Sequence, residues 1–579
     1  MTIIDAPRPK ERALVDLRVS AARAAELRAL AMRVPSWRLT WRQLCDLELL
    51  ACGAFSPLRS YLGARDYRSV CENGRLADGT LWPIPVTLDL PGRLLSSTVT
   101  NGMLGLRDGE GELLAMLQIT EAWQPSRRAE AHAVFGSTDA AHPGVEYLLE
   151  RTNRWYVTGR LEVLKLPEHR DFRDLRKTPA QQRAEFTRLG WERVVAFQTR
   201  NPMHRAHQQL TLRAAEAADA KLLIHPIVGI GRPGDVDAPT RVRCYRAIMR
   251  EYPPGTATLA LLPLAMRMAG PREAVWHAII RANYGATHFI VGREHASPGV
   301  DSGGHAFYPP YAAQELLAEH AAEIGVEIVP FRKMVYVPET DAYRAEDEVR
   351  PGTASLSISG TELRNRLATG KDLPSWFTPP SVAAELHRTF PPPTERGFTV
   401  FFTGLSGAGK STIAESLCAA LYERYGRQVT LLDGDLVRNQ LSSDLGFSRR
   451  DRDRNVLRIG YVAAEITRHR GIAICAPIAP YHRTRREVRR TVEGGGGFLL
   501  VYVSTPLEVC EERDRKGLYA KARAGLLDNF TGVSDTYEPP SDAEVVIDTT
   551  AMPVCQAVDA ILARLQALRY LPALSVQVG

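Results

Sequence analysis

The sequence predicts a multidomain α/β protein, and three observations lead to this prediction. With 579 residues, the chain is long enough to hold several domains, each with its own hydrophobic core. In residues 171–390 and again in 398–579, short apolar runs alternate with helical patterns, which is typical of parallel sheets covered by helices. Residues 1–170 contain short alternating runs separated by turn residues, which is typical of a small β-barrel.

The first predicted domain, residues 1–170, starts with a helix over 21–32 and continues as short strands. An Asp-Gly dipeptide at 108–109 stands between two apolar runs and predicts a hairpin. The His-Pro-Gly sequence at 142–144 predicts a further turn. No set of side chains suited to catalysis stands out in this domain. The expected strands are 81–90, 103–106, 113–119 and 160–166.

The middle domain, residues 171–390, is expected to form a parallel sheet. Ligands bind at the carboxyl ends of the strands in such sheets, so the loops that follow the strands are the expected places for a site. Ser359 and Glu362 form a capping-box pattern that opens a helix ending at Gly370. The expected strands are 194–197, 222–228, 258–262, 288–291 and 326–331.

The last domain, residues 398–579, is expected to be a second α/β unit. The proline-rich residues 391–397 precede it and are interpreted as an interdomain linker. A helix is expected from about residue 553. The expected strands are 399–403, 429–432, 472–476, 498–503 and 545–547.

One segment of the middle domain combines a buried strand, a polar turn and two imidazoles. Asn201 followed by Pro202 predicts the start of a helix, because Asn caps free N–H groups and Pro suits the first helical position. His204 and His207 are then expected on one face of this helix. Because a helix N-terminus concentrates positive potential, the turn over 198–201 predicts a site for a highly charged anion.

Three further polar loops in this domain cover residues 229–235, 263–271 and 291–299, near strand ends. With Arg293 and His295, they are expected to converge on the same anion pocket. The middle domain has neither a Lys-Ser phosphate loop nor a nucleophilic Ser or Cys arrangement. This favours direct displacement at a phosphate, with arginine and imidazole stabilising the charge.

Residues 404–412 fit the phosphate-loop pattern G-x-x-x-x-G-K-[ST] and stand between an apolar strand and a helix, as the motif requires. The glycines let backbone N–H groups wrap a phosphate, Lys410 is expected to reach the β- and γ-phosphates, and Ser411 is expected to ligate magnesium. The loop consists of Gly404, Leu405, Ser406, Gly407, Ala408, Gly409, Lys410, Ser411 and Thr412.

Acidic and basic side chains follow this loop. Asp433 and Asp435 end the next strand, where carboxylates hold magnesium waters or take a proton from an attacking hydroxyl. Further on, guanidinium groups and an aromatic ring suit a nucleotide with a second anion, although a salt-bridged surface helix explains the composition equally well. These side chains are Arg438, Phe447, Arg452 and Asn455. The basic segment 513–523 is either a lid over phosphates or a surface helix.

The composition of the chain limits the kinds of function that we expect. The net charge is +7 without a basic-aromatic platform, so we expect small anionic substrates and no nucleic acid. The eight cysteines show no C-x-x-C pair, so we expect reduced thiols in a cytoplasmic protein, with no zinc or haem. No apolar run approaches the roughly 20 residues that span a bilayer, and the N-terminal stretch lacks a signal-peptide core, so no membrane association or export is expected.

Several of these segments resemble known families. The run Gln198-Thr-Arg-Asn-Pro-Met-His-Arg-Ala-His207 resembles the signature of ATP sulfurylase (sulfate adenylyltransferase), and so do residues 262–276, 292–299 and 358–364. Residues 53–58 and 76–83 resemble the PUA-like domain of the same family. Residues 398–579 resemble adenylylsulfate (APS) kinase through the phosphate loop and through residues 433–435, 445–447, 451–452, 513–525, 530–533 and 537–540.

The resemblance implies a fold and a function. The fold is an N-terminal PUA-like β-barrel, a Rossmann-like nucleotidyltransferase α/β domain and a C-terminal P-loop kinase α/β domain. The chain is expected to convert ATP and sulfate to APS and pyrophosphate, and then ATP and APS to ADP and the 3′-phosphate of APS (PAPS). Magnesium is the expected cofactor with ATP, and the resemblance implies a homo-oligomer, a dimer.

The family patterns also imply residue roles. The sulfate ligands are Gln198, Arg200 and Ala296, and the residues toward the first ATP are Gln198, Asn201, His204, His207, Gly292, Arg293, Glu294, His295 and Val335. The catalytic set is Thr199, Arg200, Asn201, His204, His207, Lys410 and Asp435. Ser411 and Asp433 are the expected magnesium partners, directly or through water. The APS ligands of the kinase are Asp435, Arg438, Phe447, Arg452, Asn455, Ile478 and Lys521.

The sequence departs from the family patterns at a few positions. Glu294 stands where Asp is usual, Ser297 where Gly is usual, and Ala479 where many APS kinases carry Ser. Three alternatives stay open. In the first, the last domain only binds a nucleotide and regulates; the presence of Lys410 speaks against this, because a regulator does not need it. In the second, the sulfurylase runs in reverse and makes ATP from APS and pyrophosphate during sulfur oxidation, since one site serves both directions. An RNA-binding role for the PUA-like domain lacks basic-aromatic support.

Overall fold

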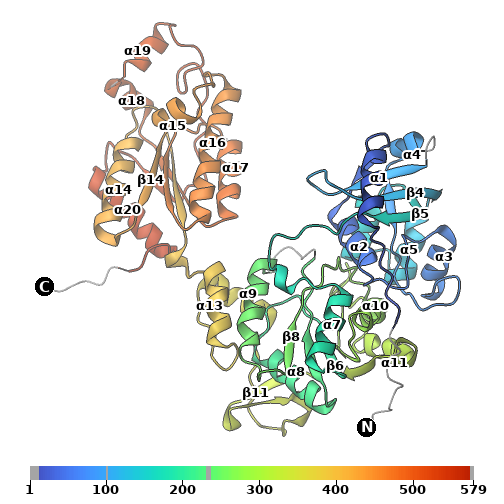
Figure 1. Ribbon diagram of the computed structural model, residues 1–579. Helices are drawn as coiled ribbons and strands as arrows, with labels where there is room; N and C mark the ends of the chain where they lie inside the picture. Colours follow the sequence, from blue (N-terminus) through green and yellow to red (C-terminus); the bar gives the residue numbers. More distant parts are fainter. Residues whose placement is uncertain (1–11, 99–101, 230–235, 331, 515, 574–579) are drawn as a thin grey trace. The chain divides into compact units, whose positions relative to one another are not determined.

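The computed structural model describes residues 12–98, 102–229, 236–330, 332–514 and 516–573. The chain divides into two compact units (Figure 1). The first unit contains residues 1–358 and 373–386, and the second contains residues 359–372 and 387–579. Among the described residues, no helix is long and apolar enough to cross a lipid bilayer.

The N-terminal part of the first unit is built on a five-stranded sheet with the order β1-β3-β4-β5-β2. β3 and β4 pair antiparallel and form the hairpin predicted at 108–109, so that prediction is confirmed. The strand predicted over 81–90 is limited to its last residues, because Pro83 and Pro85 have no N–H to donate to a ladder. The strands are β1 (Ser36–Arg38), β2 (Leu88–Leu90), β3 (Met103–Arg107), β4 (Leu113–Trp123) and β5 (Trp155–Val163).

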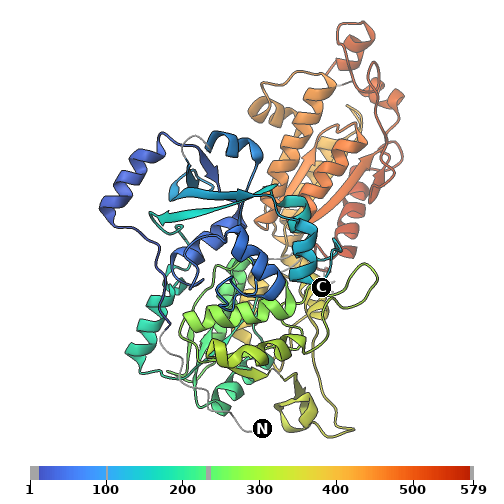
Figure 2. The same cartoon turned by 90° about the vertical axis from the view of Figure 1, so that its right-hand side faces the viewer.

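Helices pack around this sheet. The predicted first helix is confirmed, begins after the capping residue Ser20 and packs against β4 (Figure 2). The turn predicted at 142–144 is instead a short helix, because the imidazole Nδ1 of His142 accepts hydrogen bonds from the Gly144 and Val145 N–H groups. The helices are α1 (Ala21–Ala31), α2 (Trp41–Ala51), α3 (Ala64–Asn73), α4 (Gly92–Thr98), α5 (Arg127–Phe135), α6 (Pro143–Glu146) and the π-helical η1 (Tyr147–Arg151).

The middle part of the first unit contains the predicted parallel sheet, with the strand order β10-β9-β6-β7-β8. All five strands were predicted, and a two-stranded hairpin, β11–β12, was not. The strands are β6 (Val194–Phe197), β7 (Lys221–Ile224), β8 (Ala257–Leu259), β9 (His288–Val291), β10 (Glu327–Pro330), β11 (Met334–Val337) and β12 (Ala342–Ala345). The helices are α7 (Pro179–Leu189), α8 (Arg205–Ala217), α9 (Ala238–Met249), α10 (Gly270–Asn283), α11 (Ala312–Ile324) and α13 (Pro380–Thr389).

The predicted helix start at Asn201 and Pro202 is wrong, because α8 begins at Arg205. The Thr199 hydroxyl accepts the Asn201 N–H at 3.1 Å and so closes a local turn that competes with helix formation. His204 then occupies the N-cap position in an extended conformation, and its N–H donates to His207 Nδ1 at 3.2 Å. The His207 imidazole therefore caps the start of the helix, while the His204 imidazole bonds to Thr378.

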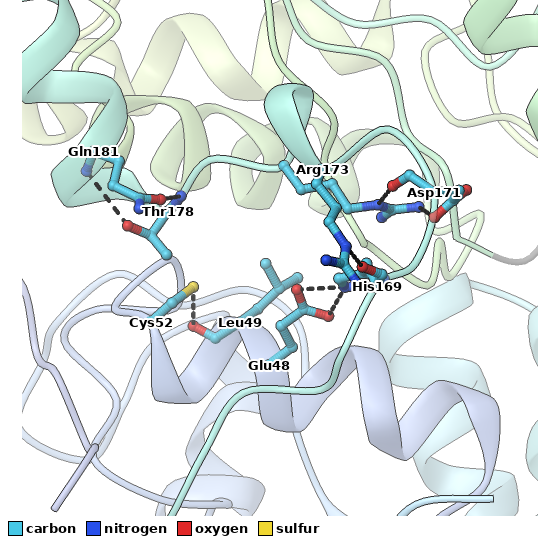
Figure 3. A network of polar contacts seen from close by, with 9 residues as sticks. Glu48, Leu49, Cys52, His169, Asp171, Arg173, Thr178 and Gln181 are labelled. Carbon is cyan, nitrogen blue, oxygen red and sulfur yellow. Dashed lines mark hydrogen bonds and ion pairs between the residues drawn. The ribbon is translucent and has the colours of Figure 1, made fainter.

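The N-terminal and middle parts of the first unit share one core, in which the rings of Phe55 and Trp276 lie 5.1 Å apart. A buried ion pair crosses the junction, with Arg267 Nη2 at 2.6 and 2.8 Å from the two Asp46 oxygens. Burial raises the pKa of Asp46, and the two arginines near it oppose that rise. The segment after the N-terminal domain is also held, because His169 Nε2 lies within 2.9 Å of both oxygens of Glu48 on α2 (Figure 3).

The second unit contains a parallel sheet with the order β14-β15-β13-β16-β17. α14 and α20 cover one face and α16 and α17 cover the other (Figure 1). The strands are β13 (Phe398–Thr403), β14 (Val429–Asp433), β15 (Ile472–Ala476), β16 (Gly497–Val503) and β17 (Val545–Ile547). The helices are α12 (Gly360–Thr369), α14 (Lys410–Tyr425), α15 (Gly434–Leu441), α16 (Arg449–Arg468), α17 (His482–Glu493), α18 (Leu507–Arg513), α19 (Leu518–Arg523) and α20 (Val554–Ala567).

Every strand predicted in the last domain is confirmed, and so is the helix predicted between Ser359 and Gly370. The Ser359 hydroxyl accepts the Glu362 N–H at 3.1 Å, and Gly370 ends the helix in the left-handed conformation. The predicted linker contains only the short turn η5 (Pro393–Glu395).

We predict that Arg267→Met destabilises the first unit by about 3 to 5 kcal/mol, because the change leaves a buried carboxylate without its partner. The Asp46→Leu/Arg267→Met double variant should recover much of this loss, since no buried charge of the pair remains. Chemical denaturation followed by tryptophan fluorescence measures both effects. Arg151→Met, which breaks the exposed pair with Glu146, is the control and should cost less than about 1 kcal/mol. A double variant no more stable than Arg267→Met would contradict the prediction.

Candidate functional site

The first candidate site lies where β6 ends and α8 begins. Two residues there are fixed through their backbones, because Arg241 Nη1 donates to the Arg200 carbonyl at 2.6 Å and the Tyr245 hydroxyl donates to the Asn201 carbonyl at 2.9 Å. The Arg200 side chain is half-buried and contacts Met268 Sδ at 3.6 Å. The side-chain oxygen of Gln198 is buried and has no hydrogen-bond partner in the described part of the chain. A polar ligand at this turn would satisfy it.

His204 and His207 are neutral at pH 7. Burial lowers the pKa of His204 to about 3, and the neighbouring His207 adds to the shift. Burial also lowers the pKa of His207 to about 4. The His204 ring stacks on Phe377 at 4.3 Å and bonds to the Thr378 hydroxyl. Since His207 Nδ1 accepts a backbone N–H, its proton lies on Nε2, which leaves a neutral hydrogen-bond donor.

The loops over 263–271 and 292–299, which were expected to converge on one pocket, contact each other. The Gly270 N–H donates to the Ala296 carbonyl at 3.2 Å, and Ala296 has φ of 53°, a strained conformation for a residue with a Cβ. A Cβ on Gly292 would meet no protein atom, so this position leaves room for a ligand. Arg293 is exposed and pairs with Glu294 at 2.6 Å.

For the remaining predicted residues of this site, the described contacts are with neighbouring elements and not with the turn that follows β6. Val335 is buried on β11, and α8 contacts that strand. The predicted loop over 229–235 contacts the loop over 263–271, because Gly229 packs so tightly on the Leu264 carbonyl that a Cβ would overlap it. Residues 230–235 of that loop lie outside the described residues.

Sequence reasoning missed three residues that support this site: Arg241, Tyr245 and Thr378. Arg241 is buried on α9 and also donates to the Ile227 carbonyl at 3.1 Å, so it ties two strand-end loops together. The only available signal was an arginine and a tyrosine four residues apart on an otherwise apolar helix face. Nothing local marks Thr378, which is distant in sequence.

The second candidate site is the phosphate loop between β13 and α14. Gly404, Gly407 and Gly409 all have positive φ, which lets the backbone fold around a phosphate. Lys410 is buried and donates to the Gly404 and Leu405 carbonyls at 2.9 and 2.6 Å. The ammonium group of Lys410 is therefore already fixed over the loop in which a phosphate would bind.

A hydroxyl and a carboxylate meet beside this loop. The Ser411 hydroxyl donates to Asp433 Oδ2 at 2.8 Å, which brings the start of α14 to the end of β14. These are hard oxygen donors of the kind that magnesium prefers, so the pair fits the expected ion. Asp435 lies on the first turn of α15, and its side chain lies outside the described residues.

The predicted APS ligands gather around the start of α16. The Arg438 guanidinium lies 4.3 Å from the centre of the Phe447 ring, which is 65% exposed. Arg452 is buried and donates to the Phe447 carbonyl at 3.1 Å and to Asp535 at 2.8 Å. Asn455 is buried one turn further on, and its side-chain oxygen has no partner among the described residues. A buried, unsatisfied oxygen and an exposed ring in the same segment suit a polar, flat ligand.

Two further predicted residues lie at the edges of this site. The Ile478 carbonyl accepts the Gly404 N–H at 3.3 Å and so borders the phosphate loop. Lys521 is exposed on α19, and no described contact joins its side chain to the loop. The basic segment itself does contact the loop, because the Tyr519 hydroxyl donates to the Ser406 carbonyl at 2.9 Å.

Comparison with protein families identifies three matching regions. Residues 7–166 match the PUA-like domain model, residues 173–389 match ATP-sulfurylase, and residues 396–548 match adenylylsulphate kinase.

Similar proteins cover almost the whole chain. A sulfate adenylyltransferase of Phaeosphaeria nodorum is 50% identical over 94% of this chain and 96% of its own length. One from Mycosarcoma maydis is 50% identical over 96% of this chain and 99% of its own. A solved structure titled hexameric APS kinase from Thiobacillus denitrificans has a TM-score of 0.77 and 39% identity, and the match covers 98% of this chain and all of that one.

We predict that the first unit loses stability as the pH falls from about 6.5 to 4. The folded-state pKa values of His204 and His207, about 3 and 4, lie below the ordinary value of 6.5. The unfolded chain therefore binds more protons in this window, which costs up to about 1.4 kcal/mol per pH unit for each histidine. His204→Asn keeps a hydrogen-bonding atom near Nδ1 but does not titrate, so urea unfolding should show a shallower pH dependence. Equal slopes for the two chains would contradict this prediction.

Proposed function

This chain belongs to the sulfate adenylyltransferase family and joins an ATP-sulfurylase domain to an adenylylsulfate kinase domain, and we propose that its two candidate sites carry out the two reactions in turn. It is a bifunctional enzyme of sulfate activation. In the first reaction a sulfate oxygen attacks the α-phosphate of ATP, and APS and pyrophosphate form. In the second, the 3′-hydroxyl of APS attacks the γ-phosphate of another ATP, and PAPS and ADP form.

In the first reaction, we assign sulfate to the turn that ends β6. The Arg200 guanidinium offsets the repulsion between two anions. Sulfate has no hydrogen to donate, so the unsatisfied oxygen of Gln198 accepts its hydrogen bond from a hydroxyl or amino group of the nucleotide. Thr199 and Asn201 hold this turn in shape through their mutual hydrogen bonds. His207, neutral in the free protein, donates a hydrogen bond from Nε2 to the departing pyrophosphate, so its contribution is a dipole and not a full charge.

The loop over 292–299 supplies further contacts in this proposal. The open space at Gly292 admits the nucleotide, and the strained Ala296 turns its N–H toward sulfate. Arg293 must leave Glu294 to bind a phosphate, and the two side chains are exposed enough for this exchange to be easy. His204 positions His207 from its buried place beside Phe377.

In the second reaction, the loop over 404–412 binds the phosphates of ATP, and Lys410 transfers its hydrogen bonds from loop carbonyls to the γ-phosphate. Ser411 and Asp433 would hold magnesium, which supplies positive charge to the transferred phosphate when bound. Asp435 is proposed as the base for the APS hydroxyl. Phe447 stacks on the adenine of APS, and Arg438, Arg452 and Asn455 bind its polar groups.

The observation that carries the proposal for the second domain is the intact phosphate loop. A domain that only binds a nucleotide for regulation has no need of Lys410 over the loop or of the contact between Ser411 and Asp433. The reverse sulfurylase reaction uses the same residues, because one transition state serves both directions. The direction in the cell therefore depends on the supply of pyrophosphate and APS.

We propose three further properties. A homo-oligomer is consistent with the Thiobacillus denitrificans protein that is titled hexameric, and light scattering distinguishes this from the dimer expected from sequence. A cytoplasmic location is consistent with eight free cysteine thiols. Domain bounds of 1–170, 171–390 and 398–579 stay predictions, with 391–397 as the linker.

We predict that Lys410→Ala makes APS but no PAPS when supplied with ATP, magnesium, sulfate and pyrophosphatase. The change removes the ammonium group that stabilises transferred charge and does not touch the first site. Chromatography of the nucleotide products measures the outcome. If the unmutated chain itself stops at APS, the assignment of kinase activity to the second domain is wrong.

We predict the opposite pattern for Arg200→Ala, which should form neither product from sulfate but should still convert supplied APS to PAPS. The guanidinium that brings two anions together is lost, at a cost of at least about a hundredfold in the first reaction. Arg205→Ala is the matched control, because Arg205 lies on the same segment and its side chain donates to the Ser375 carbonyl. APS formation at the normal rate by Arg200→Ala would refute the assigned role.

A further inference from the structure

Glu273 is a carboxylate that is completely buried at the first turn of α10, beneath the first candidate site. Its two oxygens accept the backbone N–H groups of Arg267 and Ala269, at 2.9 and 2.8 Å. Both groups belong to the loop that reaches Arg200 through Met268. One carboxylate therefore fixes the backbone of a loop that borders the anion turn.

The same carboxylate also reaches the second loop of the site, through an imidazole. His277 is completely buried one helical turn along α10, and its Nε2 lies 3.2 Å from Glu273 Oε1. On the other side of the ring, His277 Nδ1 lies 2.9 Å from Nε2 of His295. His295 belongs to the loop over 292–299, so a continuous chain of contacts runs from one site loop to the other.

The charges in this chain of contacts determine where the protons lie. Burial raises the pKa of Glu273, but His277 and the two backbone N–H groups outweigh it and hold that pKa at about 2. Burial lowers the pKa of His277 and lowers that of His295 to about 3, so both rings are neutral at pH 7. The anion therefore favours the tautomer that carries its hydrogen on His277 Nε2, and His277 Nδ1 is left to accept a hydrogen bond from the Nε2–H of His295.

This arrangement leaves His295 with one defined tautomer and one defined ring orientation. Its Nδ1 is the acceptor, and the ring packs at 5.6 Å from Phe289 on β9. The next residue, Ala296, is the strained one whose carbonyl accepts the Gly270 N–H. A strained turn persists only when the contacts around it hold it in place, and contacts from α10 do so on both sides of Ala296.

We propose that Glu273 and His277 are positioning residues for the transfer of AMP to sulfate, acting through His295 and the loop over 267–269. This inference rests on the proposed function of the first site. Neither residue is exposed to a ligand, so neither touches a substrate. They act by holding two substrate-binding loops at one separation, in the way that residues behind a metal or an active-site histidine hold its geometry.

The test compares two substitutions of the same buried ring. His277→Asn keeps an amide oxygen near the place of Nδ1 and can still accept a hydrogen bond from the Nε2–H of His295. His277→Gln places its amide near the place of Nε2 and keeps the contact with Glu273 only. Both variants remove a ring of the same size from the same buried place, so the cost of burying a polar amide largely cancels between them.

We expect His277→Gln to raise the KM for sulfate and ATP and to lower kcat/KM for APS formation about a hundredfold, because a loop shift near 1 Å has an effect of this order. His277→Asn should stay within about threefold of the unmutated chain, since the bond to His295 survives. A merely structural role would lower the amount of active protein and the melting temperature but would leave both KM values unchanged. Equal KM values in the unmutated chain and both variants would overturn the inference.

A double-variant cycle shows whether His277 acts through His295. If it does, His277→Gln combined with His295→Gln is no worse than His295→Gln alone, because the same bond is already lost. Additive losses in kcat/KM would overturn the inference. If His277→Gln does not fold, the same comparison is made with Glu273→Gln and Glu273→Asp. Only Glu273→Asp, which conserves the charge, should keep the normal KM values.

The second domain supplies the internal control. Every variant should convert added APS and ATP to PAPS at the normal rate, since the phosphate loop is untouched. An unmutated chain that makes PAPS from added APS but no APS from sulfate would refute the proposed function of the first site, and this inference would fall with it. Normal APS formation by the unmutated chain and by all variants would overturn the inference alone.

Discussion

Both candidate sites depend on the geometry of parallel strands. In a parallel sheet the carboxyl ends of neighbouring strands lie at one edge, and the loops that leave them are close in space although they are far apart in sequence. In the first unit, β6, β7 and β9 are followed by the loops that carry Gln198, Gly229 and Gly292. In the second, β13 and β14 bring Ser411 to Asp433. The same constraint therefore builds two different anion sites in one chain.

Loops alone are too flexible to hold such sites, and buried charges make them rigid. Arg241 holds the turn at Arg200, and Glu273 holds the loop at Arg267. Arg267 is in turn held by Asp46, which belongs to the N-terminal domain. Buried charges are costly unless they are paired, so each of them binds backbone groups or an opposite charge. The N-terminal domain thus supports the site without contributing a predicted ligand.

The side chains proposed to bind ligands differ in how far the free protein already fixes them. Lys410 is held by loop carbonyls in the place where a phosphate would bind, and the histidines at the start of α8 are neutral because they are buried. Arg293 is paired with Glu294, and in the proposed reaction it exchanges that partner for a ligand. In the proposed mechanism, the first site therefore relies on oriented dipoles and on the Arg200 guanidinium more than on a cluster of charges.

The sequence by itself determined the α/β class, all ten strands of the two parallel sheets and the phosphate loop, because these depend on local periodicity and on glycines in a fixed pattern. It also placed Gln198 to His207 at a strand end. The start of α8 was predicted wrongly, since the Thr199 turn competes with the helix only at the level of individual hydrogen bonds. The roles of Arg241, Glu273 and Thr378 were not predicted, because their partners are distant in sequence and their roles depend on burial. Only the tertiary structure decided which charges are buried, and so which residues hold the site in place.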